Sequence, residues 1–318
     1  MKTLPVVENL KHWGPEGTCS DAISLAEAQR YCRQLSLGHY ENFPVVTWFL
    51  PRDVQPHFYA IYAYCRWADD LADEISDPAE SLRLLNWWED RFRDCFRRAN
   101  TMVHSPALAP PSGQFIHPVF VALEQTIRDR QLPAEPFLDL ISAFRQDQVV
   151  HEYQTFDDLR DYCRRSADPV GRLILHLFGL AAEQNLAWSD SICTGLQLAN
   201  FWQDLGRDAA RGRHYLPHED RIRFGYEDAD YANRAANAAF IELMTFEVER
   251  AEKLLLAGKP LVRQFPRRLR VDVELFIRGG LGILDHIRAD GFRLWDRRST
   301  LSKFDFLKLG VGSLWQVF

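Results

Sequence analysis

Hydrophobic positions along the chain recur mostly at intervals of three and four residues, the spacing of one face of an α-helix. No alternating hydrophobic run bounded by hairpin turns interrupts this pattern. The helices are expected to break at Pro51, at Ser76-Asp77-Pro78 and from Gly212 to Pro217, because prolines and glycines end helical runs. The sequence therefore predicts an all-α fold and disfavours a fold based on a sheet.

One segment has the composition of a loop. Residues 100–114 are rich in proline, serine and glycine, which predicts a surface loop. A chain of 318 residues is long enough for two domains, but an α-helical enzyme with one large cavity also reaches this size. We expect residues 1–318 to form a single domain, with residues 1–26 as an N-terminal extension. The 47% of hydrophobic residues suffices to bury a core and to line a pocket.

Charge and cysteine usage exclude several classes of protein. The net charge of −6 disfavours a nucleic-acid-binding protein, because such proteins need an excess of basic residues. Six cysteines are scattered singly, without the spacing of a zinc site or a disulfide framework: Cys19, Cys32, Cys65, Cys95, Cys163 and Cys193. We therefore expect reduced thiols and a cytoplasmic protein.

No segment of the sequence is expected to cross a membrane. The N-terminus lacks the pattern of a signal peptide, and no uncharged apolar run reaches the length of a membrane-spanning helix. The tail Val311–Phe318 is apolar enough to contact a membrane surface, and packing onto the protein's own fold is the alternative. Peripheral contact with the inner face of the membrane thus stays open.

The segment 56–75 carries the first acidic pattern. Five of its residues share one helical face: Tyr62, Cys65, Arg66, Asp69 and Asp73. Asp70 and Glu74 are expected to point elsewhere. Asp69 and Asp73 lie roughly 6 Å apart along the helix axis, so both carboxylates can reach shared hard cations. The alternative is a solvated acidic helix end.

The segment 190–217 repeats the pattern. Gln197, Asn200, Asp204 and Asp208 fall on one side of the expected helix, as a second row of oxygen ligands. Two such rows are more informative than one, since carboxylates that face a core are costly without a cation or a hydrogen-bond partner. The alternative is a pair of unrelated surface salt-bridge faces.

Paired rows of carboxylates suit the departure of diphosphate from an allylic carbon. Magnesium ions held by the rows would stabilise the negative charge on the leaving group as the carbon–oxygen bond breaks. The sequence lacks a GxSxG elbow, a Walker loop and an HExxH helix. Gly279-Gly280-Leu281-Gly282 follows no expected strand, so it indicates close helix packing instead of a dinucleotide-binding loop. We expect two to three Mg2+ ions and no use of NADPH.

Ordered motifs resemble those of the squalene/phytoene synthase family. They are LPRD before IYAYCRWADDLAD, then TFDDLRDYC, LQLANFWQDLGRD, RGRHYLP, ILDHI and WDRR, and the resemblance covers residues 27–298. It implies a single-domain isoprenoid-synthase helical bundle around a central apolar cavity. It also implies which residues bind magnesium: Asp69, Asp73, Asn200, Asp204 and Asp208.

The resemblance implies further site residues. Tyr162 is implied as a catalytic residue near the reacting carbons. Nine residues are implied to bind the substrate or its diphosphate: His39, Asn42, Phe43, Tyr62, Arg66, Gln197, Asn200, Arg278 and Arg297. Purely structural roles remain as alternatives. Arg66 can neutralise Asp69 through an i,i+3 contact, and Arg297 can be part of a solvated helix end. The aromatic residues and His39 can equally be ordinary core residues.

Within the family, the motifs HYENFP, YCRRSADPVGRL and ELFIRGGLGILDHI are similar to those of bacterial hydroxysqualene synthases. These enzymes ionise presqualene diphosphate, rearrange the cation and capture water, which gives hydroxysqualene for squalene and hopanoid biosynthesis. One alternative is a head-to-head prenyl transferase that makes presqualene diphosphate, squalene, phytoene or dehydrosqualene. Another is a non-catalytic protein that binds prenyl lipids or serves assembly. The oligomeric state stays open.

Two departures from the wider family fall at positions expected to line the substrate pocket. Glu41, Asn42 and Phe43 stand where many relatives carry a serine-phenylalanine pair, and Gly280 stands where they carry a tyrosine. Both changes weigh against condensation of two substrates. A roomier or more polar pocket end would tolerate water capture.

Overall fold

The structure is a computed structural model that describes residues 6–17, 23–38, 50–104 and 117–298. Throughout these ranges the regular structure is helical, apart from an isolated β-bridge between Glu152 and His214. The predicted all-α class is therefore confirmed. The chain divides into two compact units, Met1–Val149 with Leu173–Gly179 and Val150–Arg172 with Leu180–Phe318, and each is described by itself.

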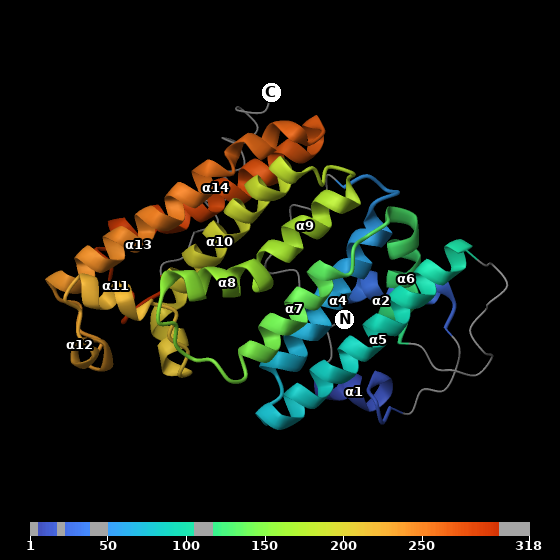
Figure 1. Ribbon diagram of the computed structural model, residues 1–318, viewed down its shortest axis with the longest axis horizontal. Coiled ribbons are helices and arrows are strands. Elements are labelled where there is room, and N and C mark those ends of the chain that lie inside the picture. The colour runs from blue at the N-terminus through green and yellow to red at the C-terminus, as the bar shows by residue number, and fades with distance from the viewer. Residues whose placement is uncertain (1–5, 18–22, 39–49, 105–116, 299–318) are drawn as a thin grey trace. The chain divides into compact units, whose positions relative to one another are not determined.

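The first unit is built around one helix. It contains α1 (Val6–Trp13), α2 (Leu25–Gly38), α4 (Gln55–Asp73), α5 (Pro78–His104), α6 (Pro118–Arg130) and α7 (Glu135–Gln146). α4 packs against each of the other helices in this unit (Figure 1). Its residues Tyr64 and Trp67 are buried and lie in ring contact with Trp88 of α5. α4 thus forms the core of the unit along most of its length.

The break between α4 and α5 lies where the sequence predicts it. α4 ends at Asp73 and α5 begins at Pro78, whose missing N–H suits a first helical turn. One Asp77 carboxylate oxygen accepts a hydrogen bond from the backbone N–H of Ala79 at 3.1 Å. The Asp77 side chain therefore caps the N-terminus of α5.

The predicted loop at residues 100–114 begins too early. α5 continues to His104, so residues 100–104 are helical, and residues 105–114 lie outside the described ranges. The side chains of Asn100 and Thr101 bond back to the carbonyls of Phe96 and Arg97. The first proline that can stop the helix is Pro106, which follows the end of α5. The composition of residues 100–114 taken as a whole did not show where within this segment the helix ends.

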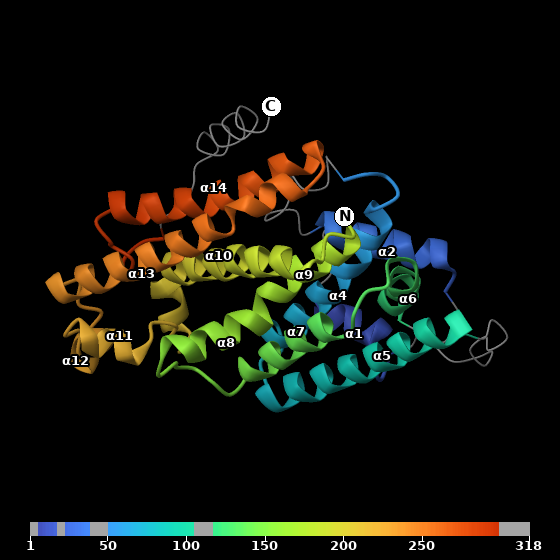
Figure 2. The same ribbon diagram turned by 45° about the horizontal axis from the view of Figure 1, so that its top comes forward.

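The second unit is also built around one helix. It contains α8 (Phe156–Ser166), α10 (Glu183–Ala210), α11 (His218–Arg223), α12 (Asp228–Ala232), α13 (Ala238–Ala257), η1 (Lys259–Gln264) and α14 (Arg267–Ala289). α10 packs against α8, α13, η1 and α14, and Figure 2 shows α10, α13 and α14 running side by side. The helix α9 (Asp168–Leu177) divides between the two units. The break expected after α10 is confirmed, since α10 ends at Ala210.

Gly280 on α14 has the packing role that the sequence predicts, whereas a Cβ at Gly279 would meet no atom within 4 Å. A Cβ at Gly280 would lie 2.9 Å from side-chain carbons of Leu196 on α10 and Leu255 on α13. These leucines fill the space that a larger residue would take. The expectation that Gly280 enlarges a pocket is therefore wrong, because the position serves close contact between helices.

Membrane and disulfide features can be checked in the same residue ranges. None of the described helices combines the length and the apolar character that crossing a bilayer requires. The cysteines in the described part of the chain are all free thiols: Cys32, Cys65, Cys95, Cys163 and Cys193.

A buried carboxyl at the start of α9 predicts a pH effect on stability. Burial, and next the nearby Asp190, raise the pKa of Asp168 to about 8, whereas its ordinary value is 3.8. The folded protein therefore keeps a proton that the unfolded chain releases, and the free energy of unfolding should fall as pH rises from about 4 to about 8. Asp168→Asn keeps an acceptor for the Thr194 hydroxyl, which lies 2.9 Å from Asp168 Oδ1. Urea unfolding at pH 5 and pH 8 should show a weaker pH dependence in the variant. Identical pH dependence in both proteins would contradict this.

Candidate active site

The first aspartate pair lies on the last turns of α4. The side chain of Asp69 is 42% exposed and that of Asp73 is also exposed. Arg66 Nη1 donates to Asp69 Oδ2 at 3.1 Å, which is the i,i+3 contact anticipated as the alternative role of this arginine. Arg66 therefore already balances one carboxylate of the pair, and its contact with diphosphate stays a prediction.

Asp70 belongs to this cluster, although the sequence places it on another face. Its residue surface is only 7% exposed, and its Oδ1 forms an ion pair with Arg66 Nη2. Burial raises the pKa of Asp70 to about 7, while the Arg66 charge acts to lower it. Arg66 thus connects Asp69 to a buried carboxyl. The i,i+4 spacing allows this contact, but the spacing does not reveal that Asp70 is buried.

Tyr62 lies one turn before Arg66, Cys65 directly precedes it, and both are partly buried. Burial raises the pKa of the Tyr62 hydroxyl, and it raises that of the Cys65 thiol to about 12. A thiol that stays protonated is a poor metal ligand, since thiolate is the form that binds metals. The donors on α4 are therefore its carboxylates.

The second aspartate pair lies near the end of α10. The Asp204 side chain is only 16% exposed and contacts Arg298, a residue 94 positions further along the chain. Arg298 Nη2 donates to Asp204 Oδ2 at 2.9 Å, and Arg298 Nε lies 2.7 Å from Asp204 Oδ1. This Oδ1 is buried and accepts no hydrogen bond from the described residues. Asp204 therefore presents one oxygen that has a nearby charge but no bonded donor.

The two arginines of the WDRR motif have different partners. Arg297 Nη2 lies 3.1 Å from Asp290 Oδ1, and its side chain is 55% exposed. Arg298, which the sequence leaves unassigned, contacts Asp204 and also donates to Gln203 Oε1 at 3.2 Å. The role of Arg297 toward diphosphate stays a prediction, and Arg298 is a site residue that the sequence misses.

A glycine between the two aspartates of α10 explains how Arg298 reaches Asp204. A Cβ at Gly206 would lie 2.8 Å from the carbonyl oxygen of Leu294 and 2.9 Å from that of Trp295. Only a residue without a side chain lets this backbone lie so close to α10. The sequence LGRD between the aspartates therefore has a packing function.

The other expected ligands on α10 are accessible to differing degrees. Asn200 is exposed, whereas Gln197 and Asp208 are partly exposed. The backbone carbonyl of Asp208 accepts from the N–H groups of Arg211 and Arg213, both at 2.9 Å, where α10 ends. The carboxylate of Asp208 thus stands on a terminal turn that is fixed by hydrogen bonds.

Tyr162 lies in a buried aromatic cluster of the second unit. The cluster joins α8, α10 and the RGRHYLP segment through Tyr153, Tyr162, Phe201 and Tyr215. The rings of Phe201 and Tyr215 stack with centroids 3.8 Å apart, and Tyr162 is only 4% exposed. Tyr162 therefore packs in the core, which is the alternative role that the sequence allows for it. Its catalytic role stays a prediction.

The remaining expected residues divide into placed and unplaced ones. Arg278 on α14 donates through Nε to Oε1 of the buried Glu274 at 2.9 Å. His39, Asn42 and Phe43 lie outside the described residues, as does the tail Val311–Phe318. The predicted roles of these three residues and of the tail therefore stay predictions.

The donor chemistry of both helices fits Mg2+, which prefers carboxylate and amide oxygens. The Asp204 Oδ1, which is buried without a hydrogen bond, is an oxygen that such a cation could bind. In the described ranges, no three His, Cys, Asp or Glu side chains form a cluster that could hold a metal by themselves. Asp69 and Asp73 belong to the first unit and Asp204 and Asp208 to the second. Their convergence on shared ions stays a prediction.

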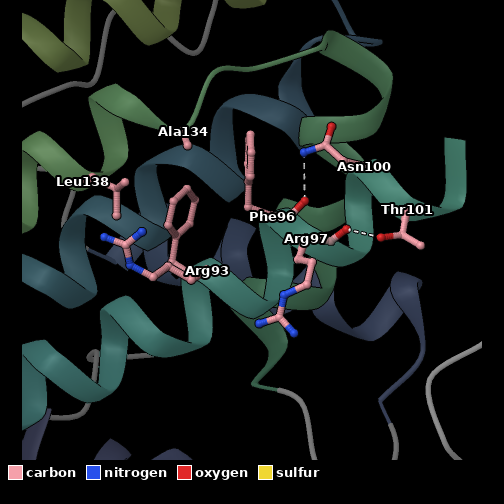
Figure 3. Close-up of a pocket in the computed structure, with 8 residues that line it drawn as sticks. Arg93, Phe96, Arg97, Asn100, Thr101, Ala134 and Leu138 are labelled. Carbon is pink, nitrogen blue, oxygen red and sulfur yellow. Dashed lines mark hydrogen bonds between the residues drawn. The ribbon is translucent and has the colours of Figure 1, made fainter. Parts of the chain in front are cut away.

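A hollow of about 550 Å3 in the first unit is a different feature (Figure 3). Phe92 and Phe96 of α5 line it together with Leu138 of α7, and its rim carries Arg93 and Arg97. It contains none of the expected site residues. We therefore do not assign the chemistry to it.

Comparison with known proteins agrees with these motifs. Residues 37–305 match the family described as squalene/phytoene synthase. A phytoene synthase of Arthrospira platensis is 29% identical over 287 residues, which cover 86% of this chain and 88% of that protein. A hydroxysqualene synthase of Sinorhizobium fredii is 30% identical over 288 residues, which cover 89% of this chain and 90% of that protein.

A solved structure extends the likeness to the fold. The squalene synthase HpnC from Alicyclobacillus acidocaldarius superposes with a TM-score of 0.76 and 41% sequence identity. The match covers 86% of this chain and 97% of HpnC. The chain has the all-helical isoprenoid synthase fold of that enzyme, and enzymes of the matched family typically use Mg2+ and prenyl diphosphates. This protein belongs to the squalene/phytoene synthase family, whose enzymes condense prenyl diphosphates head to head.

Proposed function

We propose that the protein is a hydroxysqualene synthase, which converts presqualene diphosphate and water into hydroxysqualene and diphosphate. The motifs HYENFP, YCRRSADPVGRL and ELFIRGGLGILDHI carry the proposal. The 41% identity to HpnC, which is described as a squalene synthase, favours squalene synthesis over phytoene synthesis. The 30% identity to a hydroxysqualene synthase supports it. The motif difference at residues 41–43 weighs in the same direction.

Residues of two helices hold the diphosphate end of the substrate in this proposal. Asp69 and Asp73 on α4 act with Asp204 and Asp208 on α10, and Asn200 adds an amide oxygen. Bound Mg2+ would supply Lewis-acid stabilisation of the charge that collects on the departing diphosphate. Arginine side chains complete the binding of that anion: Arg66, Arg278 and Arg297.

Aromatic and polar residues serve the hydrocarbon end. Ring faces attract cations, so Tyr62, Phe43 and Tyr162 would lower the energy of the carbocation after diphosphate has left. His39, Asn42 and Gln197 would line the same pocket and contact the substrate. The reaction forms one carbon–oxygen bond to water, breaks the carbon–oxygen bond to diphosphate and releases one proton. It needs no reductant.

Isotope labelling tests this function directly. Purified protein is incubated with presqualene diphosphate and Mg2+ in water enriched in 18O, and the product is analysed by mass spectrometry. We expect hydroxysqualene that carries the label in its hydroxyl group, with the same yield whether or not NADPH is present. A reduced hydrocarbon formed only with NADPH would contradict the proposal.

A substrate control separates the leading reading from its alternatives. Farnesyl diphosphate alone should release no diphosphate if the protein only ionises presqualene diphosphate. Release from farnesyl or geranylgeranyl diphosphate would instead identify a two-substrate prenyl transferase. Tight prenyl-diphosphate binding with no turnover of either substrate would favour the non-catalytic alternative.

A further inference from the structure

The N-terminal helix α1 contacts the end of the helix that carries the first aspartate pair. The backbone N–H of Val6, the first residue of α1, donates to Glu74 Oε2 at 3.0 Å. Glu74 directly follows Asp73 and forms the C-cap of α4. α1 ends at Trp13, before residues 37–305, the part of the chain that matches the family. It therefore lies outside the matched region, yet it is bonded to the residue next to a predicted magnesium ligand.

Other contacts hold α1 in place as well. Trp13 lies in ring contact with Tyr31 of α2, with centroids 5.8 Å apart. The Tyr31 hydroxyl accepts a hydrogen bond from Nε1 of Trp67 on α4 at 3.0 Å. At the other end of α1, Val6 is only 2% exposed. The packing of α1 thus does not depend on the hydrogen bond to Glu74 alone.

Glu74 competes with the aspartates of α4 for Arg66. Arg66 Nη1 donates to Asp69 Oδ2 at 3.1 Å, and Nη2 forms an ion pair with Asp70. The same Nη2 lies 3.9 Å from Glu74 Oε1, so one guanidinium faces three carboxylates. Glu74 is the farthest of the three, and its other oxygen is bonded at the positive end of α1. This bond keeps Glu74 from drawing Arg66 away from Asp69.

We propose that Glu74 is a positioning residue through which α1 keeps Arg66 on the first aspartate pair. The inference rests on the proposed function, because it needs Mg2+ and diphosphate at this pair. Without the N–H of Val6, the Glu74 carboxylate would turn to Arg66. Asp69 would then be less neutralised and would bind Mg2+ more tightly, while Arg66 would be less available to diphosphate.

Val6→Pro tests the proposal, because proline lacks the N–H but suits the first turn of a helix. The Kd for Mg2+ alone, measured by calorimetry, should fall about three- to fivefold, the range expected for loss of a partly exposed ion pair. With Mg2+ saturating, the Kd for inorganic diphosphate should rise by a similar factor. Damage to the structure of the site would instead weaken both affinities.

A double variant identifies the residue that transmits the effect. In Glu74→Gln the amide oxygen still accepts from the Val6 N–H, but the side chain carries no charge and cannot compete for Arg66. Adding Val6→Pro to this variant should therefore change both Kd values less than about twofold. Val6→Ala is the matched control for packing, since it trims the same buried side chain and keeps the N–H. It should also leave both Kd values within about twofold of wild type.

A second variant serves if Val6→Pro does not fold. Glu74→Gln alone removes the competing charge at an exposed position, so it should weaken Mg2+ binding and strengthen diphosphate binding. Glu80→Gln removes a similarly exposed charge on α5 and should change neither affinity. Unchanged affinities in Val6→Pro, parallel loss of both, or an equal effect in the Glu74→Gln background would overturn the inference alone. Wild-type protein that binds neither Mg2+ nor diphosphate would overturn the proposed site and the inference with it.

Discussion

Asp204→Asn should lower the rate of diphosphate release from presqualene diphosphate about 10²- to 10³-fold, the usual effect of losing one group that stabilises developing negative charge. Asparagine has nearly the same shape as aspartate, so packing is preserved while one negative ligand for Mg2+ is lost. The substitution also leaves Arg298 without its carboxylate partner. Release is measured by a coupled diphosphate assay at saturating Mg2+.

A control on the same helix separates chemistry from folding. Asp190 on α10 pairs with Arg172 at 2.7 Å and has no part in the proposed site. Asp190→Asn should keep the release rate within about threefold of wild type, since Asp190 lies 14 positions before Asp204 on α10, about 21 Å along the helix axis. Equal loss of rate in both variants would mean that the Asp204 effect is structural. Full activity in Asp204→Asn would remove this residue from the mechanism.

Phe201→Ala should lower the free energy of unfolding of the second unit by about 3–5 kcal/mol. Phe201 is only 3% exposed and stacks on Tyr215 with ring centroids 3.8 Å apart. Truncation removes this stacking and leaves a cavity beside Tyr162 that the surrounding helices cannot fill without moving. Urea unfolding followed by tryptophan fluorescence measures the change.

The matched control is an apolar residue outside the core. Ile222 on α11 is 58% exposed, so Ile222→Ala should change the free energy of unfolding by less than about 0.5 kcal/mol. A loss below about 1 kcal/mol in Phe201→Ala would show that the aromatic cluster contributes little to stability. In that case, Tyr162 would need another source of rigidity.

Local patterns carried most of what the sequence predicts correctly. The helices α4 and α10 and their acidic rows follow from spacings of three and four residues, which is a short-range property. The end of α4 before Pro78 is equally local. Expectations of this kind need no knowledge of how distant parts of the chain meet.

The residues that the sequence misses depend on long-range packing or on burial. Arg298 meets Asp204 only because the chain returns to α10 after 94 positions, and no spacing reports that return. Asp70 contacts Arg66 as expected of an i,i+4 neighbour, but its burial comes from helices that surround α4. Gly280 illustrates the opposite error, since a missing side chain suggested open space where neighbouring leucines already lie.

The close approach at Gly206 has a mechanical consequence for the second aspartate pair. Since the carbonyl oxygens of Leu294 and Trp295 occupy the space that a Cβ at Gly206 would need, α10 cannot rotate about its axis without displacing this backbone. Rotation of α10 is therefore coupled to displacement of Arg298. Any tilt that re-aims Asp204 would carry its arginine with it.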